Sequence, residues 1–298
     1  MLACHNRVDK TLAALAALLS QKGCEDVDLR VHLLDDASAD GTPERVAALF
    51  SDRRSAVDVA GPGPATFHEV TVHRGNGQLF WNGGMRRAFA AALREDHDHY
   101  LWLNDDTIMD ADALRTLLDT HHAVSDEVGR PIIVAGSTRD PDTGALTYGG
   151  VNRPSRMRPL RFDLITPGTH PRASETMNGN CVLIPRAVAQ RVGNLEPGYR
   201  HGMGDYDYGL RARAAGCEVW ITAGTIATCS TNPVARAGQG PLREEWGRVR
   251  STKGLPPADW TVFARRWAGA LWPVYWASPY VRRGFALLRQ RLWAGRGR

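Results

Sequence analysis

The chain has 298 residues, of which 43% are hydrophobic and 23% charged, and its formal net charge is +5. This composition is ordinary for a soluble globular protein, and a chain of this length can bury a sizeable core. The five cysteines include no C-x-x-C pair, which argues against a zinc site or a disulfide framework and favours a reducing compartment.

Strands and helices are predicted to alternate over the first hundred residues. The predicted strands are Met1–Cys4, Leu29–Leu34, Glu69–His73 and Tyr100–Leu103, and the predicted helices are Val8–Ser20, Pro43–Phe50 and Arg86–Glu95. Residues 51–66 are rich in Gly and Pro and predict a loop. This alternation favours a mostly parallel α/β sheet with helices on both faces.

The second half of the chain predicts further strands and helices. A helix from Asp110 to near Val124 is followed by predicted strands at 132–136, 176–184 and 217–222, and by predicted helices at 185–192 and 205–215. Between them, residues 146–148 and 160–162 are expected to pair as the two strands of an inserted hairpin.

The C-terminal tail differs from the rest of the chain in charge. Residues 260–298 contain eight arginines and no acidic residue, whereas residues 1–259 carry a net charge of −3, from 29 basic and 32 acidic residues. We expect a catalytic domain at 1–230 and a basic, Trp-rich helical extension at 231–298. The extension could be an amphipathic helix at an anionic membrane surface or a helix that docks on its own domain or on a second subunit. A nucleic-acid partner is disfavoured because the basic charge is confined to the tail.

Two adjacent carboxylates follow the apolar run Tyr100–Leu103. Asn104, Asp105 and Asp106 would emerge at the carboxyl end of this strand, where open α/β sheets bind ligands. Neighbouring carboxylates repel each other and need a cation when they lose water, and hard divalent ions prefer oxygen ligands. These residues predict a site for Mg²⁺ or Mn²⁺ bound together with a diphosphate. The alternative is that they only cap the N-terminus of the following helix.

Other polar clusters follow strands or open helices. Asp35 and Asp36 end the second strand, and a glycine-rich stretch from Gly75 to Met85 follows the third. The backbone N–H groups of that stretch could approach a nucleotide phosphate, although it lacks the dinucleotide-binding spacing. Further along the chain come Asn178-Gly179 and the pair Asp205 and Asp207.

In order and spacing these clusters resemble the family 2 glycosyltransferases, which have the GT-A fold. The resemblance covers roughly residues 1–225. Its motifs are the opening strand and turn Leu2–Arg7, the nucleotide-binding loop Leu34–Thr42, the metal-binding element Leu103–Thr107 and the acidic helix Gly202–Arg211.

The resemblance implies roles for individual residues. Asp106 would bind the metal, Mn²⁺ or Mg²⁺, and Asp205 would be the general base that deprotonates the acceptor hydroxyl. The residues expected at the donor nucleotide are Asn6, Asp35, Asp36, Asn76, Gly77, Asn104 and Asp105. Those expected at the sugar or acceptor are Trp81, Asn178, Gly179 and Asp207, with a second base or a helix cap as alternatives for Asp207 and plain packing as the alternative for Trp81.

Two features depart from the family pattern. Many members have a histidine shortly after the last strand, but residues 224–232 contain none. The usual Glu-Asp pair is here Gly204-Asp205, so a single carboxylate carries the base assignment.

The resemblance implies an inverting, metal-assisted hexosyl- or deoxyhexosyltransferase. Its donor would be a nucleotide-diphosphate sugar, and its acceptor a glycan or lipid-linked hydroxyl in bacterial cell-envelope polysaccharide biosynthesis. With no secretory signal in the first residues, we expect a cytoplasmic protein, with peripheral contact at the inner face of the membrane left open. The alternatives are a sugar-nucleotide pyrophosphorylase and a non-catalytic sugar-nucleotide-binding partner of a membrane assembly.

Overall fold

A computed structural model describes residues 1–59, 68–231, 242–252 and 254–294. The strands are β1 (Leu2–Cys4), β2 (Leu29–Asp35), β3 (His68–Arg74), β4 (His99–Leu103), β5 (Ile108–Met109), β6 (Ile132–Arg139), β7 (Leu146–Tyr148), β8 (Gly150–Asn152), β9 (Asp163–Leu164), β10 (Arg172–Ser174), β11 (Thr176–Met177), β12 (Cys181–Pro185) and β13 (Glu218–Thr228). The helices are α1 (Val8–Leu19), α2 (Thr42–Val59), α3 (Phe80–Ala92), α4 (Ala113–Val128), α5 (Arg186–Val192), α6 (Gly204–Ala214), α7 (Leu242–Arg250), α8 (Pro257–Trp267), the 3₁₀ turn η1 (Gly269–Leu271) and α9 (Trp272–Ala294).

The predicted α/β fold is confirmed, but its sheet is mixed: β5, β7, β10 and β12 all pair antiparallel with their neighbours. β1, β2 and β3 pair in parallel, and β13 pairs in parallel with β6. Met1 joins the two groups of strands, because its amino group donates to Leu101 O (2.7 Å) and its carbonyl accepts from Leu103 N (3.1 Å). One strand, β12, runs antiparallel between β4 and β6. The first residue of β12 therefore lies beside the last residue of β4.

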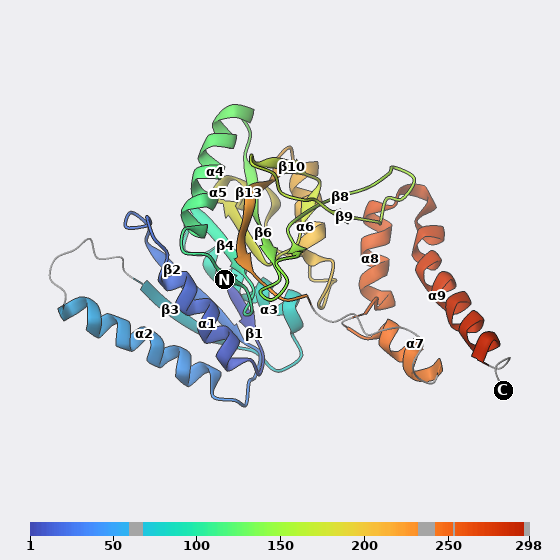
Figure 1. Cartoon of the computed structure of the whole chain (residues 1–298), viewed down its shortest axis with the longest axis horizontal. Coiled ribbons are helices and arrows are strands. Elements are labelled where there is room, and N and C mark those ends of the chain that lie inside the picture. The colour runs from blue at the N-terminus through green and yellow to red at the C-terminus, as the bar shows by residue number, and fades with distance from the viewer. Residues whose placement is uncertain (60–67, 232–241, 253, 295–298) are drawn as a thin grey trace.

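Helices cover both faces of this sheet (Figure 1). Neighbouring strand residues point to opposite faces, so Leu33 belongs to the buried cluster that includes residues of α1, α2 and α4, and Leu34 to the cluster that includes residues of α3, α5 and α6. Trp102 is fully buried on the second face, edge-on to Phe89 and to Tyr208. This packing fixes α3 and α6, the two helices that later contribute site residues.

Several predicted elements differ from the structure. The predicted hairpin of 146–148 with 160–162 is wrong: β7 pairs with β6, residues 160–162 form no strand, and β9 directly after them pairs with β8. The predicted strand 176–184 is broken into β11 and β12. Residues 51–59, predicted as loop, continue α2, and residues 60–67 lie outside the described ranges. Helix α3 begins at Phe80 rather than Arg86.

The C-terminal helices form a separate packed group. α7, α8 and α9 lie together at the side of the sheet away from α2 (Figure 1). Trp260 and Phe263 of α8 are buried against Tyr199 and Leu210, and α9 packs on this cluster through Trp276 and Tyr280. No helix in the described ranges is long and apolar enough to cross a bilayer. The predicted boundary at 230/231 borders residues 232–241, which are not described, and stays a prediction.

Asp207 holds α8 to α6. Its side chain is fully buried, and its Oδ1 accepts hydrogen bonds from Arg266 (2.8 Å), Trp267 Nε1 (2.9 Å) and the Tyr199 hydroxyl (3.2 Å). Its Oδ2 accepts from Arg211 Nε at 2.8 Å. Two arginines from different helices therefore share one buried carboxylate.

We predict that Asp207→Asn lowers the free energy of unfolding by about 3 kcal/mol, because it leaves Arg211 without its anion and Arg266 with only Glu196 (2.7 Å). Urea titration followed by circular dichroism measures this change. The matched control is Glu69→Gln, which breaks an exposed ion pair with Arg30 (3.5 Å) and should cost less than about 1 kcal/mol. Equal losses in the two variants would contradict a structural role for Asp207.

Candidate active site

The polar clusters meet at one edge of the sheet because of the strand directions. The ends of β1, β2, β3, β4 and β13 lie at this edge, and so does the start of the antiparallel β12. The loop after β4 is bonded to the start of β12 through Asn104 N, which donates to Asn180 O at 2.9 Å. Segments far apart in the sequence thereby form one surface.

The turn after β1 and the loop after β2 are fastened to each other. Asn6 N donates to Ser38 Oγ (2.9 Å), and Asn6 Oδ1 accepts from Ala39 N (2.8 Å). Asn6 has a positive φ of 50°, which an asparagine tolerates better than most residues. Val8 N, at the start of α1, donates to Asp40 Oδ2 at 3.0 Å. The two predicted nucleotide-binding segments are thus a single wall of the edge.

Asp36 organises the glycine-rich loop rather than facing outward. Its Oδ1 accepts from Asn76 N (3.2 Å) and Gly77 N (2.8 Å), and its Oδ2 accepts from Leu79 N (2.8 Å) and Phe80 N (3.1 Å). A Cβ at Gly75 would lie 2.4 Å from Asp36 Oδ1, so only glycine fits there. The loop owes its shape to this carboxylate.

Asp35, by contrast, is completely buried at the end of β2. Its Oδ2 accepts from Ser38 N (3.2 Å) and lies 3.8 Å from Arg74, while Cys4 Sγ lies 3.8 Å from its Oδ1. The structure places Asp35 and Asp36 at the predicted edge, with their side chains turned into the protein.

Asp105 and Asp106 both pair with the guanidinium group of Arg7. Arg7 NH1 lies 2.8 Å from Asp105 Oδ1, and Arg7 NH2 lies 3.0 Å from Asp106 Oδ2. Burial raises the pKa of Asp105 to about 6; Arg7 opposes this shift and Asp106 adds to it. The alternative of a helix cap is wrong, because β5 follows this loop and α4 begins only at Ala113.

Cys229 lies in the region 224–232, after the last strand, where many members of the family have a histidine. It directly follows β13, is buried, and its Sγ is 3.6 Å from Asp106 Oδ1 and 3.5 Å from Asn180 Nδ2. Burial and the charge of Asp106 raise the pKa of this thiol to about 11. Asp106 therefore has Arg7 at one oxygen and a neutral thiol at the other.

The oxygen-rich donor set fits a hard divalent cation. Arg7 already places a positive charge between the two carboxylates, which indicates that their oxygens converge on one cation-binding point. Asp106, with Asp105 beside it, is the group that would hold such an ion.

Trp81 connects the acidic loop to the base candidate. Its Nε1 donates to Asn104 Oδ1 at 2.7 Å, and its ring lies against Gly179, where a Cβ would be 2.6 Å away. Gly179 N in turn donates to Asp205 Oδ2 at 2.9 Å. One indole ring therefore stands between Asn104 and Asp205, and glycine at position 179 permits that approach.

Asp205 begins α6 in a partly enclosed position. Its Oδ1 accepts from Tyr206 N at 2.9 Å. Burial raises its pKa to about 6, although the backbone N–H groups of Gly179 and Tyr206 favour the ionised form. No arginine or lysine in the described ranges pairs with this carboxylate.

Two other predicted residues lie at the margin of this arrangement. Asn178 bonds to the Gly149 backbone and, through Nδ2, to the Tyr206 hydroxyl (3.4 Å). Asp207 is not brought to the cluster, since its oxygens bond to Tyr199, Arg211, Arg266 and Trp267.

Sequence reasoning missed Arg7 and Cys229. Arg7 is the last residue of the opening motif Leu2–Arg7, and an arginine just after a strand and turn carries no signal of its own. Cys229 could have been found by asking which residue replaces the missing histidine, because β13 ends at the same edge as β4.

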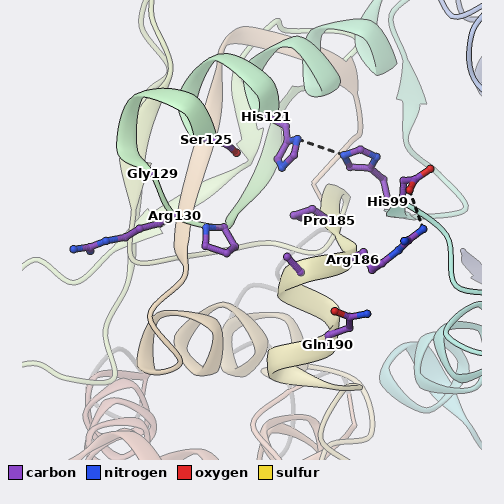
Figure 2. A pocket seen from close by; sticks show the side chains of 11 residues that line it. His99, His121, Ser125, Gly129, Arg130, Pro185, Arg186 and Gln190 are labelled. Atoms are coloured by element: carbon purple, nitrogen blue, oxygen red, sulfur yellow. Dashed lines mark hydrogen bonds and ion pairs between the residues drawn. The ribbon is translucent and has the colours of Figure 1, made fainter.

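A cavity of about 570 Å³ lies elsewhere in the molecule (Figure 2). Its lining includes His99, His121, Arg130 and Arg186, and His99 begins β4, at the end opposite to Asn104. It is separate from the acidic edge.

Comparisons with known proteins agree with this geometry. Residues 1–174 match the family model described as Glycosyl transferase family 2. A search of curated proteins found no match. Among solved structures, GalNAc-T7 with UDP, GalNAc and Mn²⁺ has a TM-score of 0.56 and 14% identity, over 84% of this chain and 47% of that one. The chain thus spans about half the length of that structure.

A second similar structure covers almost the whole chain. The mannosyltransferase PcManGT from Pyrobaculum calidifontis, in complex with GDP-Man and Mn²⁺, has a TM-score of 0.54 and 16% identity, over 98% of this chain and 72% of that one. At these identities the two likenesses establish the fold.

The raised pKa of Asp205 predicts a pH-dependent stability difference. In the folded chain the pKa is about 6, against an ordinary value of 3.8. Protonated Asp205 therefore contributes stability that is fully present below pH 3.8 and lost as pH rises through 6. Relative to Asp205→Asn, the wild type should lose on the order of 2 kcal/mol of unfolding free energy between pH 4 and 7.

Urea titrations of both proteins across this pH range measure the difference, and the exposed Asp142→Asn variant is the control. The difference in unfolding free energy between wild type and Asp142→Asn should not change with pH. If the difference between wild type and Asp205→Asn does not change either, the raised pKa of Asp205 is contradicted.

Proposed function

This chain belongs to glycosyl transferase family 2, and from that premise we propose that it moves a hexosyl or deoxyhexosyl group from a nucleotide-diphosphate sugar to an acceptor hydroxyl, with inversion. The acceptor we propose is a glycan or a lipid-linked glycan. One observation carries the proposal: the Trp81 ring and Gly179 hold a base candidate, Asp205, next to the acidic loop 104–106.

The donor would bind along the wall formed by the loops after β1, β2 and β3. Asn6, Asn76 and Gly77 lie in these loops. The carboxylates of Asp35 and Asp36 accept hydrogen bonds from backbone N–H groups of the loops and so hold their shape. Asp106, with Asp105, would hold Mn²⁺ or Mg²⁺. When bound, the metal neutralises the negative charge of the diphosphate leaving group.

Asp205 has the properties that a general base needs. With a pKa of about 6 it is ionised at pH 7 and yet basic enough to accept a proton from a hydroxyl group that is attacking. In the proposed step the acceptor oxygen bonds to the anomeric carbon, the bond from that carbon to the diphosphate breaks, and the hydroxyl proton goes to Asp205. Attack from the face opposite the diphosphate inverts the anomeric centre.

The two alternatives from the sequence are less well supported. Membership of a glycosyltransferase family favours transfer over a pyrophosphorylase. A non-catalytic binding protein has no use for an unpaired, partly buried carboxylate at Asp205, which costs stability at neutral pH.

The exposed side chains of α9 point to where in the cell the protein acts. α9 exposes Val281, Phe285 and Leu288, each more than half accessible, beside Arg282 and Arg289. Apolar side chains next to arginines suit an anionic bilayer surface. We propose that α9 brings the enzyme to a membrane that carries a lipid-linked acceptor.

Substitutions of Asp106 and Asp205 should separate binding from transfer. We predict that Asp106→Ala loses metal-dependent binding of the donor nucleotide, measured by calorimetry in a screen of nucleotide sugars with Mn²⁺ and Mg²⁺. Asp205→Asn should keep that binding and lose about 1,000-fold in transfer or donor hydrolysis, because the base is gone. Asp142→Asn is the control for both assays.

If Asp205→Asn transfers sugar as fast as the wild type, the base assignment is wrong. If Asp106→Ala binds metal and nucleotide normally, the metal assignment is wrong.

The membrane proposal predicts co-sedimentation of the chain with anionic phosphatidylglycerol vesicles and weaker binding to neutral phosphatidylcholine vesicles. The double variant Phe285→Glu and Leu288→Glu should reduce binding at least tenfold, since it removes apolar area and adds negative charge. Leu164→Glu, at an exposed leucine on β9, should bind like the wild type. Equal binding by all three proteins would rule out α9 as the contact.

A further inference from the structure

A cluster of metal-ligating side chains lies outside the proposed active site, on the face of the sheet covered by α3. His32 comes from the middle of β2, and Glu95 and His97 come from the segment between α3 and β4. One ligand atom from each of these residues lies within 4.8 Å of the other two.

The surroundings of His32 suit a metal ligand. Its side chain is only 3% exposed, and its Nδ1 lies 3.2 Å from His73 Nε2. With the shared proton on Nδ1, the lone pair of His32 is on Nε2. That nitrogen is buried and lies 3.4 Å from Glu95 Oε2, an approach that lacks the geometry of a hydrogen bond. A metal-bound histidine usually donates the N–H of one ring nitrogen to a neighbouring group and binds the metal through the lone pair of the other.

Glu95 lies between the two candidate nitrogen ligands. Its Oε2 is 3.4 Å from His32 Nε2 and 3.1 Å from His97 Nε2. Two ligands bound tetrahedrally to one Zn²⁺ at its usual bond lengths are about 3.3 Å apart. The two imidazole nitrogens are no more than 4.8 Å apart, and rotation of the partly exposed His97 ring closes the set.

Glu95 supplies a negative charge for the ion. Its side chain is partly exposed and lies between the ring nitrogens of His32 and His97, so a cation bound there would be partly neutralised by this carboxylate.

We propose that His32, Glu95 and His97 form a Zn²⁺ site, one that uses none of the cysteines whose spacing argued against zinc. Two imidazoles and one carboxylate suit zinc, whereas Mg²⁺ and Mn²⁺ prefer an all-oxygen set such as the one at Asp106. Because Glu95 and His97 reach the surface, a water molecule can take the fourth position. The ion ties the centre of β2 to the turn that follows α3, and so stabilises the folded chain.

A second histidine group makes a natural comparison. His99, His121 and His122 also place their ligand atoms within 4.8 Å of one another. His99 Nε2 and His121 Nδ1 already share a hydrogen bond (3.3 Å), and Figure 2 shows Arg186 close to His99. This group has no carboxylate ligand, whereas the first group has Glu95. It is the weaker site and provides the control.

The test uses the full-length chain after treatment with a chelator. Zn²⁺ binding is measured by calorimetry, and Co²⁺ is added separately to record the visible absorption of a four-coordinate site. The variants are Glu95→Gln and His97→Ala, both at partly exposed side chains, so the fold should survive them. His122→Ala and Asp106→Ala are the controls, one for each of the other candidate metal positions.

We expect one Zn²⁺ to bind the wild type and both controls and to raise their thermal midpoint, as a ligand of the folded state does. Glu95→Gln and His97→Ala should each weaken Zn²⁺ binding at least tenfold, lose the rise in midpoint and lose the four-coordinate Co²⁺ spectrum. Absence of binding in the wild type overturns the proposal. So does unchanged binding in the two variants, or a loss confined to His122→Ala or Asp106→Ala. Since none of these readouts involves sugar transfer, the result is independent of the proposed enzyme activity.

Discussion

The candidate site depends on the contacts of one residue, Asn104. Its backbone N–H bonds to Asn180 O, which attaches the loop after β4 to the start of the antiparallel strand β12. Its side-chain oxygen accepts from Trp81 Nε1, which attaches the same loop to the first turn of α3. Without these two hydrogen bonds, the carboxylates at 105 and 106 would have no fixed relation to the residues on α3 or at 178–180. The antiparallel direction of β12 makes the first contact available, because it places the start of β12 beside the end of β4.

The carboxylates at this edge differ in how their charge is satisfied, and this difference separates structural from functional ones. Four backbone N–H groups bond Asp36, and two arginines bond Asp207, so both are fully occupied within the protein. Asp105 and Asp106 share the single guanidinium of Arg7. Asp205 has only two backbone donors and a raised pKa. The carboxylates with least compensation are those for which we propose metal binding and proton transfer.

The sequence predicted the fold class and the edge at which the site lies, because alternating apolar runs and the positions of strand ends are local signals. It could not predict which direction a carboxylate faces. Asp36 is predicted at the nucleotide, and in the structure its carboxylate shapes the loop 75–80, an arrangement that depends on β3 lying beside β2. Arg7 was missed because its partners are about a hundred residues away. The predicted start of α3 is too late, because glycines at 83 and 84 are more typical of a loop. In the structure both belong to α3, where Gly84 lies against Ala3.

The C-terminal helices are joined to the helix that carries the proposed base. Asp205 and Asp207 lie two residues apart at the start of α6, so they point in different directions around the helix axis. Asp205 points to Gly179, while Asp207 points to Arg266 and Trp267 of α8. Any displacement of α8 must therefore either break a buried ion pair or move the first turn of α6. Because breaking that pair is costly, the position of the tail and the position of the base are coupled. If α9 contacts a membrane, that contact acts on α8 directly, and through Asp207 it reaches the turn that holds Asp205.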